Sequence, residues 1–209
     1  MACGAIGSPL FVIIFLIEGA ARAGYNPIRH PISSLSIGES GWIQIASFML
    51  SGSLIVAFAF GLGVVLNPKR SVWIPRLIGA VGIGLIGAGI FSSDPLYGYP
   101  ASLPLAVAQY TVHGHLHDLF SIFVFVCLPL ACFKFFKRFK NMGEHGWAAY
   151  SRFTGIAMLL AFILAGIGFK QVPGLVRIAG ALQRLTIIIG FTWITLVALY
   201  LRRRSRLTN

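Results

Sequence analysis

The chain has 209 residues, of which 57% are hydrophobic and only 11% are charged, whereas a soluble domain carries charge on about a quarter of its residues. This composition excludes an ordinary soluble domain and predicts a polytopic membrane protein, because an apolar run of roughly 20 residues can cross a bilayer. The net charge of +12 sits between and after the apolar runs. It therefore indicates membrane topology and argues against nucleic acid as a partner.

Six apolar runs follow one another along the chain, and each predicts a transmembrane helix. The first run resembles a signal peptide at Ala21–Ala23, but no basic residue precedes it, so we expect a retained span. The expected spans are residues 6–23, 41–66, 73–91, 112–133, 153–169 and 182–201. The sequence thus predicts an all-α bundle of six transmembrane helices that forms a single domain over residues 1–209.

The basic residues between the spans predict the orientation of the bundle. Loops 67–76 and 134–152, together with the C-terminal tail, hold twelve of the 17 Lys and Arg residues. Cytoplasmic loops carry the excess of basic residues, so both termini are expected in the cytoplasm. We therefore expect a multi-pass protein of a prokaryotic plasma (inner) membrane, whose basic tail meets anionic lipid headgroups.

This topology gathers most of the reactive side chains at the non-cytoplasmic face. Four of the five acids and four of the five histidines fall on that side. These residues are Glu18, Glu39, Asp94, Asp118, His30, His113, His115 and His117. Acids and histidines are rare in membrane proteins and often mark functional positions, so a polar site is expected at this face.

The segment HGHLHD, which opens the fourth span, carries the main chemical hypothesis. His113 and His117 are spaced i, i+4, which places both imidazoles on one helix face and suits two ligands of one metal. His30 could supply a third nitrogen, while Asp94 and Asp118 could act as catalytic base or oxygen ligand. A divalent metal, with zinc as the first choice, would then activate water to hydrolyse a lipid or small amphiphile.

The same residues also allow purely structural roles. Histidine pairs near a membrane surface also bond to lipid, water or loop carbonyls, and Asp94 before Pro95 is an ordinary turn and cap residue. Haem is a less favoured cofactor, because it would need His30 and either His113 or His117 on opposite faces of its ring.

Arginines on the non-cytoplasmic side suggest two further roles. Arg29 and Arg184 are candidates for contact with lipid headgroups, whereas Glu18 and Arg22, spaced i, i+4, predict an internal ion pair. Small residues at every fourth position predict close helix packing in three spans. They are Ser53, Ala57 and Gly61; Ala80, Gly84 and Ala88; and Ala157, Ala161 and Ala165.

Four segments together resemble a known family: NPIRHPISSLSIGESGWIQ, FSSDPLYGYP, HGHLHDLFS and GLVRIAGALQR. They are similar to the bacterial and archaeal membrane family of domain of unknown function 998. The matching positions are Pro27, Arg29, Ser33, Gly41, Trp42, Asp94, Pro95, His113, Gly114, His117 and Asp118, with Gln183 and Arg184 matching in part. The resemblance implies a six-helix membrane protein with a polar site, and it implies no activity.

Two functions of different classes therefore remain. The leading hypothesis is a metal-dependent hydrolase that acts on a lipid or small amphiphile at the outer face. The alternative is a non-enzymatic protein, either an accessory subunit beside other membrane subunits or a lipid- or ligand-binding protein. Transport ranks last, because the centres of spans two, three and five are almost free of polar groups.

Overall fold

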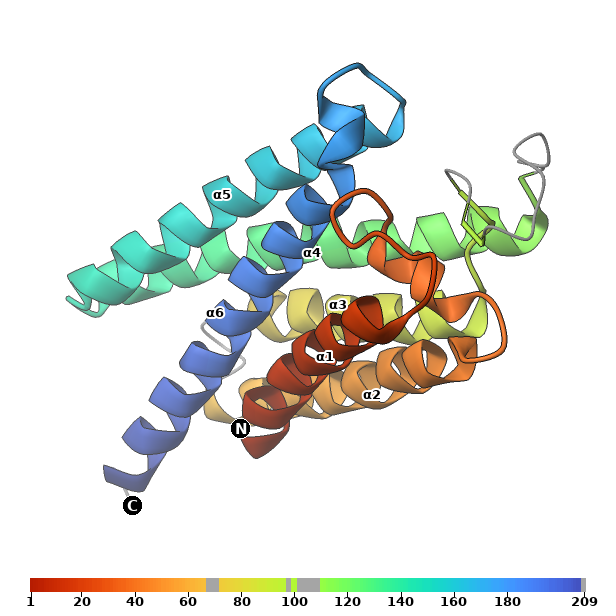
Figure 1. The fold of residues 1–209 in the computed structure, drawn as a ribbon. Helices are drawn as coiled ribbons and strands as arrows, with labels where there is room; N and C mark the ends of the chain where they lie inside the picture. The colour runs from red at the N-terminus through yellow and green to blue at the C-terminus, as the bar shows by residue number, and fades with distance from the viewer. Residues whose placement is uncertain (67–71, 97–98, 101–109, 208–209) are drawn as a thin grey trace.

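The computed structural model describes residues 1–66, 72–96, 99–100 and 110–207. Within them the chain folds into six long helices, each long and apolar enough to cross a membrane. The helices are α1 (Ala2–Ala21), α2 (Gly41–Val65), α3 (Trp73–Ile90), α4 (Val112–Asn141), α5 (His145–Phe169) and α6 (Ala179–Leu207) (Figure 1). The predicted all-α architecture of six spans is confirmed.

Three helices run further than the hydropathy of the chain predicted. Helix α4 continues to Asn141 rather than ending at Phe133, and α5 begins at His145 rather than near residue 153. Likewise, α6 continues to Leu207. Mean hydropathy detects the part of a helix that lies in lipid. The extensions of α4 and α5 are amphipathic and bury residues such as Phe139 and Ala148, whereas the extension of α6 begins with the exposed residues Arg202, Arg203 and Arg204.

The six helices form a closed ring in chain order. Each helix packs against its neighbours in the sequence, and α1 packs against α6 to close the ring. One end of the bundle, here called the termini end, holds the starts of α1, α3 and α5 and the ends of α2, α4 and α6 (Figure 1). The opposite end, the loop end, holds the ends of α1, α3 and α5 and the starts of α2, α4 and α6. Lys69 and Arg70, used to predict the orientation, lie outside the described residues.

Helices α2 and α3 approach each other backbone to backbone through glycine. A Cβ atom on Gly52 would lie 2.8 Å from the carbonyl oxygen of Gly82, and one on Gly82 would lie 2.7 Å from the oxygen of Gly52. The small residues predicted for this contact in α2 are one position off, because Ser53 and Ala57 are exposed. The close approach itself is the packing that small residues allow in lipid.

Candidate functional site

The α1–α2 connection folds back into the loop end of the ring. Its 3₁₀ turn, η1 (Ile32–Ser36), packs against α1, α2 and α6. The side chains of Ile32 and Leu35 are buried, so the turn is anchored by apolar burial. The N–H of Ile32 donates to Oε1 of Gln183 at 2.8 Å, which ties the turn to the start of α6. This turn forms the inner floor of the candidate site.

Arg22 holds the second half of this connection. Its guanidinium pairs with the carboxylate of Glu18 at 2.5 Å, so the predicted i, i+4 ion pair is confirmed. The same group donates to three backbone carbonyls, those of Leu35 (3.3 Å), Ile37 (3.1 Å) and Ser40 (3.0 Å). The end of α1 is thereby joined to the start of α2.

Arg184 holds the first half of the connection from inside the protein. Its side chain is 7% exposed, and Nη1 donates to the carbonyl oxygens of Pro27 at 2.5 Å and His30 at 2.9 Å. Nη2 donates to the hydroxyl of Tyr25, and burial raises the pKa of Tyr25 to about 12, so this phenol stays protonated at neutral pH. Arg184 thus points into the protein. The sequence had suggested that it contacts lipid headgroups.

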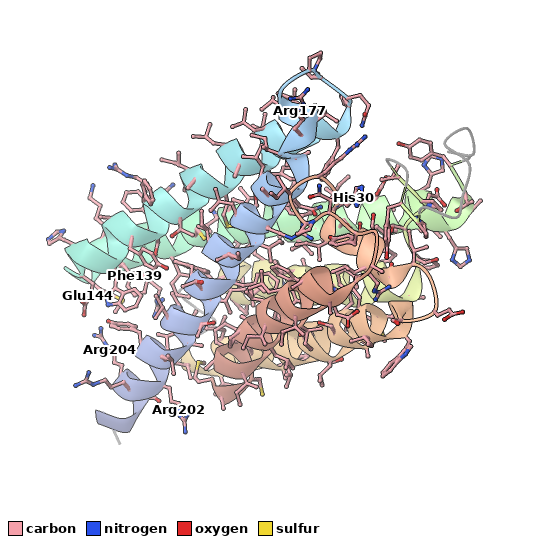
Figure 2. The ribbon with its side chains drawn as sticks, viewed as in Figure 1. His30, Phe139, Glu144, Arg177, Arg202 and Arg204 are labelled. Carbon is pink, nitrogen blue, oxygen red and sulfur yellow. The ribbon has the colours of Figure 1, made fainter. Side chains whose placement is uncertain are left out.

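Arg29 lies on the same connection but has a different setting. Its side chain is exposed, whereas the neighbouring His30 is buried (Figure 2). The contact of Arg29 with lipid headgroups stays a prediction, since exposure allows it and nothing else bears on it.

Asp94 holds Thr111, the N-cap residue of α4. Its Oδ2 accepts the N–H of Thr111 at 2.8 Å, and its Oδ1 accepts the hydroxyl of the same residue at 2.7 Å. The Thr111 oxygen in turn accepts the N–H of Gly114 at 3.1 Å, which satisfies one of the unpaired donors of the first helical turn. Both carboxylate oxygens are engaged by Thr111, which fits a structural role at this helix end. Asp94 also lines the cavity described below, and its catalytic role stays a prediction.

His117 is the most deeply placed polar group of the HGHLHD segment. It is 3% exposed, and its Nδ1 lies 3.0 Å from the carbonyl oxygen of Ala88 and 2.8 Å from that of Phe91. Carbonyl oxygens only accept hydrogen bonds, so Nδ1 carries a hydrogen, and in the neutral form of the ring this leaves the lone pair on Nε2. The two carbonyls belong to the last turn of α3, where such groups lack helical partners.

The other predicted metal ligands do not join His117. His113 is exposed, with its ring centroid 5.7 Å from that of Phe91. His30 packs against Tyr25 and Tyr99, with ring centroids 5.5 Å and 5.4 Å away. Among the described residues, no three His, Cys, Asp or Glu side chains gather so that they could hold a metal ion.

The predicted cofactors therefore do not fit these residues. A zinc hydrolase site takes three protein ligands, and the expected convergence of His30, His113 and His117 is not found among the described residues. The reason is that His117 turns toward the end of α3, whereas His30 is enclosed by the α1–α2 connection. His30 lines neither of the two cavities that His117 lines, so these two cavities offer haem no place between both rings.

A cavity of about 320 Å³ opens beside His117 at the loop end. Its polar wall comes from the α1–α2 and α3–α4 connections, α4 and α6, and its apolar wall comes mainly from α4 and α5. The polar wall includes Ser33, His117, Asp118, Ser121 and Gln183. The apolar wall includes Ile122, Phe125, Phe162 and Phe169. The lining therefore offers both hydrogen-bonding groups and apolar surface to a bound molecule.

A smaller cavity of about 40 Å³ continues this space toward the ring axis. The two cavities share Ser33, His117, Ser121, Phe125 and Gln183. The inner one adds apolar residues of α1, α2 and α3, namely Phe11, Phe48 and Leu85. Together the two cavities form the candidate site, here called the loop-end cavity.

The sequence pattern predicted part of this site. It singled out Asp94, His117 and Asp118, which all line the cavity, but it gave Ser121 and Gln183 no role in the chemistry. It also missed the wall from α5, because Phe162 and Phe169 look like any lipid-facing aromatic residues. The i, i+4 spacing of Ser121 after His117 was the one available signal.

Comparison with known proteins places the chain in a family. Residues 5–200 match the family described as Protein of unknown function (DUF998). The chain belongs to this family. The resemblance carried by the four segments is thus confirmed, and the match includes every residue of the loop-end cavity. No curated protein and no solved structure matches the chain, so membership in DUF998 gives an architecture without an activity.

Proposed function

We propose that this DUF998 protein binds a lipid or small amphiphile in the loop-end cavity. The observation that carries the proposal is the pairing of a polar wall around His117 with an aromatic wall between α4 and α5. A volume of about 320 Å³ lies at the lower end of the range typical of small-molecule sites, roughly 300–1,000 Å³. The cavity therefore suits a headgroup or the first part of a chain rather than a whole phospholipid.

The polar wall supplies both kinds of hydrogen-bonding group. Nε2 of His117 accepts, the hydroxyls of Ser33 and Ser121 donate or accept, and the carboxyl group of Asp118 adds a charge at the mouth. Lys170 also lines the cavity, so both signs of charge are available. A zwitterionic or hydroxyl-bearing headgroup matches this set, while the aromatic wall favours the adjoining hydrocarbon.

Hydrolysis of the bound amphiphile is our second candidate function. It is favoured by the Nδ1 hydrogen bonds of His117, which leave Nε2 in the form that a general base requires. The hydroxyl of Ser121 and the carboxyl of Asp118 line the same cavity. This candidate uses the side chains of the cavity alone, because the described residues do not gather the ligands of a metal.

Filling the cavity tests the binding proposal. Gly166 lines the cavity, and a Cβ atom there would meet no atom within 4 Å, so Gly166→Leu can enter the open space without a clash. The matched control is Gly63→Leu in α2, where a Cβ also meets nothing within 4 Å. Binding of a fluorescent phospholipid to the purified protein should weaken about 10-fold or more in the first variant, the scale of a misfit in an apolar pocket.

The control separates cavity filling from a general effect of leucine. Equal affinity of the wild type and both variants would contradict the binding proposal. Mass spectrometry of the same samples tests hydrolysis, because a cleaved lipid that appears with wild type and disappears with His117→Gln supports the second candidate. Intact lipid with wild type contradicts hydrolysis and leaves the binding proposal standing.

A further inference from the structure

The end of α4 carries a basic stripe that its apolar run does not explain. Lys134, Lys137, Arg138 and Asn141 follow the spacing i, i+3, i+4 and i+7, which places them on one helix face. Phe135 and Phe139, each 1% exposed, occupy another face and pack into the core. The alternation of basic and aromatic residues therefore extends α4 as an amphipathic helix whose polar face lies away from the core.

This stripe lines a cavity of about 690 Å³ at the termini end of the bundle. Helix α3 contributes Trp73 and Ile74 at its start, and α6 contributes Arg204 near its end. Four of the residues that line the cavity are basic, namely Lys134, Lys137, Arg138 and Arg204, and none of them is acidic. Two helices, α4 and α6, thus direct one sign of charge toward a single hollow, here called the basic cavity.

Arg204 is held in place by neighbours outside this cavity. Its Nη1 donates to Oε1 of Glu144 at 3.2 Å and to the hydroxyl of Tyr200 at 2.7 Å, and Figure 2 shows Arg204 and Glu144 close together. The ring of Tyr200 packs against Phe139 and Trp147, with centroids 5.4 Å and 4.9 Å away. A fixed cation costs less entropy on binding than a mobile one.

Positive charge at the termini end is far from balanced by the protein itself. All five acids of the sequence fall within the described residues, and Glu144 alone lies at this end, since the other four lie toward the loop end. Glu144, which pairs with Arg204 and does not line the basic cavity, is therefore the one acidic side chain at the end that holds these four cations. An anion from outside the chain is the natural complement to such a site.

We propose that the basic cavity binds the phosphate-bearing headgroup of one anionic phospholipid. The position of the cavity along α4 favours a lipid as the source of this phosphate. The basic stripe begins at Lys134, where the apolar run of α4 ends. Trp73, the first residue of α3, is 57% exposed at the cavity rim, and exposed tryptophans gather at the level of headgroups. Basic pockets between spans are a known means of holding anionic headgroups.

Binding of phosphatidylglycerol to the purified full-length protein in detergent tests this proposal, with native mass spectrometry as the readout. The test variant replaces Lys134, Lys137 and Arg138 with Gln. The matched control replaces Lys140, Arg202 and Arg203 with Gln, because these cations are exposed at the same end and do not line the basic cavity. The test variant should bind about 100-fold more weakly, and the control should bind like wild type.

Three results would overturn the proposal. One is a control variant that loses as much affinity as the test variant, because the attraction would then be diffuse. Another is phosphatidylcholine binding as tightly as phosphatidylglycerol. The third is inorganic phosphate binding as tightly as the lipid, which would make a soluble anion the ligand.

A second measurement serves if the triple variant does not fold. Trp73 lies at the cavity rim, so its emission should change when phosphatidylglycerol is added to the wild-type protein. The change should be absent from Trp73→Phe, whose exposed position tolerates the substitution. An equal change in both proteins would overturn the proposal. The basic cavity lies at the opposite end from the loop-end cavity, so either proposal can fail without the other.

Discussion

Asp94, a catalytic candidate from the sequence, has a structural contact in the fold. A lone acid at the start of an outer loop, near a histidine cluster, was a reasonable candidate for a base. In the structure, however, its carboxylate caps α4 through Thr111 and lies against the backbone of Gly114. A Cβ atom on Gly114 would overlap Oδ2 of Asp94. The glycine of HGHLHD is therefore required by the acid that sits on it.

Substitution of Gly114 tests this cap. Gly114→Ala should lower the free energy of unfolding by about 2 kcal/mol, because the displaced carboxylate loses hydrogen bonds to Thr111. Gly146→Ala is the control, since a Cβ there meets no atom within 4 Å and an alanine favours the helix. Unfolding titrations in mixed micelles measure both variants.

A double-mutant cycle separates the cap from other effects of the new methyl group. In an Asp94→Ala background the clash is gone, so Gly114→Ala should cost much less than it does in wild type. Equal costs in the two backgrounds would show that Asp94 is not the reason for the glycine.

Helix α3 is the element that depends most on small residues, because it packs closely on two sides. Gly82 faces α2, whereas Gly84 faces α4, where a Cβ atom would lie 2.7 Å from the carbonyl oxygen of Phe120. Association in lipid gains little from the hydrophobic effect, so such close contact supplies the attraction between spans. The site depends on this packing, since the end of α3 supplies the two carbonyls that orient His117.

A methyl group on Gly52 should separate α2 from α3. Its Cβ would lie 2.8 Å from the backbone oxygen of Gly82, and a backbone atom cannot turn aside as a side chain can. Gly52→Ala should therefore lower the free energy of unfolding by roughly 1–3 kcal/mol. Gly63→Ala in the same helix, with no neighbour within 4 Å, should leave stability unchanged or raise it slightly. Comparable losses in both variants would contradict this account of the contact.

At the scale of the whole molecule, the sequence predicted the spans well and the site only in part. Six runs of lipid-facing residues show themselves in hydropathy, so the number and order of helices followed directly. The closure of α1 on α6 leaves no such signal, yet it brings Arg184 to the α1–α2 connection. Because the sequence does not reveal that contact, it allowed His30 to be predicted as a metal ligand together with His117.

Orientation is the property of the whole molecule that remains to be tested, and labelling can decide it. Of the 15 Lys and Arg residues that the structure describes, ten lie toward the termini end, so this end should face the cytoplasm. In a background with Cys3, Cys127 and Cys132 changed to Ala, two exposed positions can each receive a new cysteine. These are Arg177→Cys at the loop end and His145→Cys at the termini end.

An impermeant maleimide should label Arg177→Cys in intact cells, and it should label His145→Cys only after the cells are opened. We expect this pattern because basic residues near the ends of spans are retained on the cytoplasmic side. This result would place the loop-end cavity where amphiphiles of the outer leaflet can reach it. It would place the basic cavity beside the anionic inner leaflet. The reverse pattern of labelling would exchange the two leaflets, and the basic cavity would then need an anionic lipid on the outside.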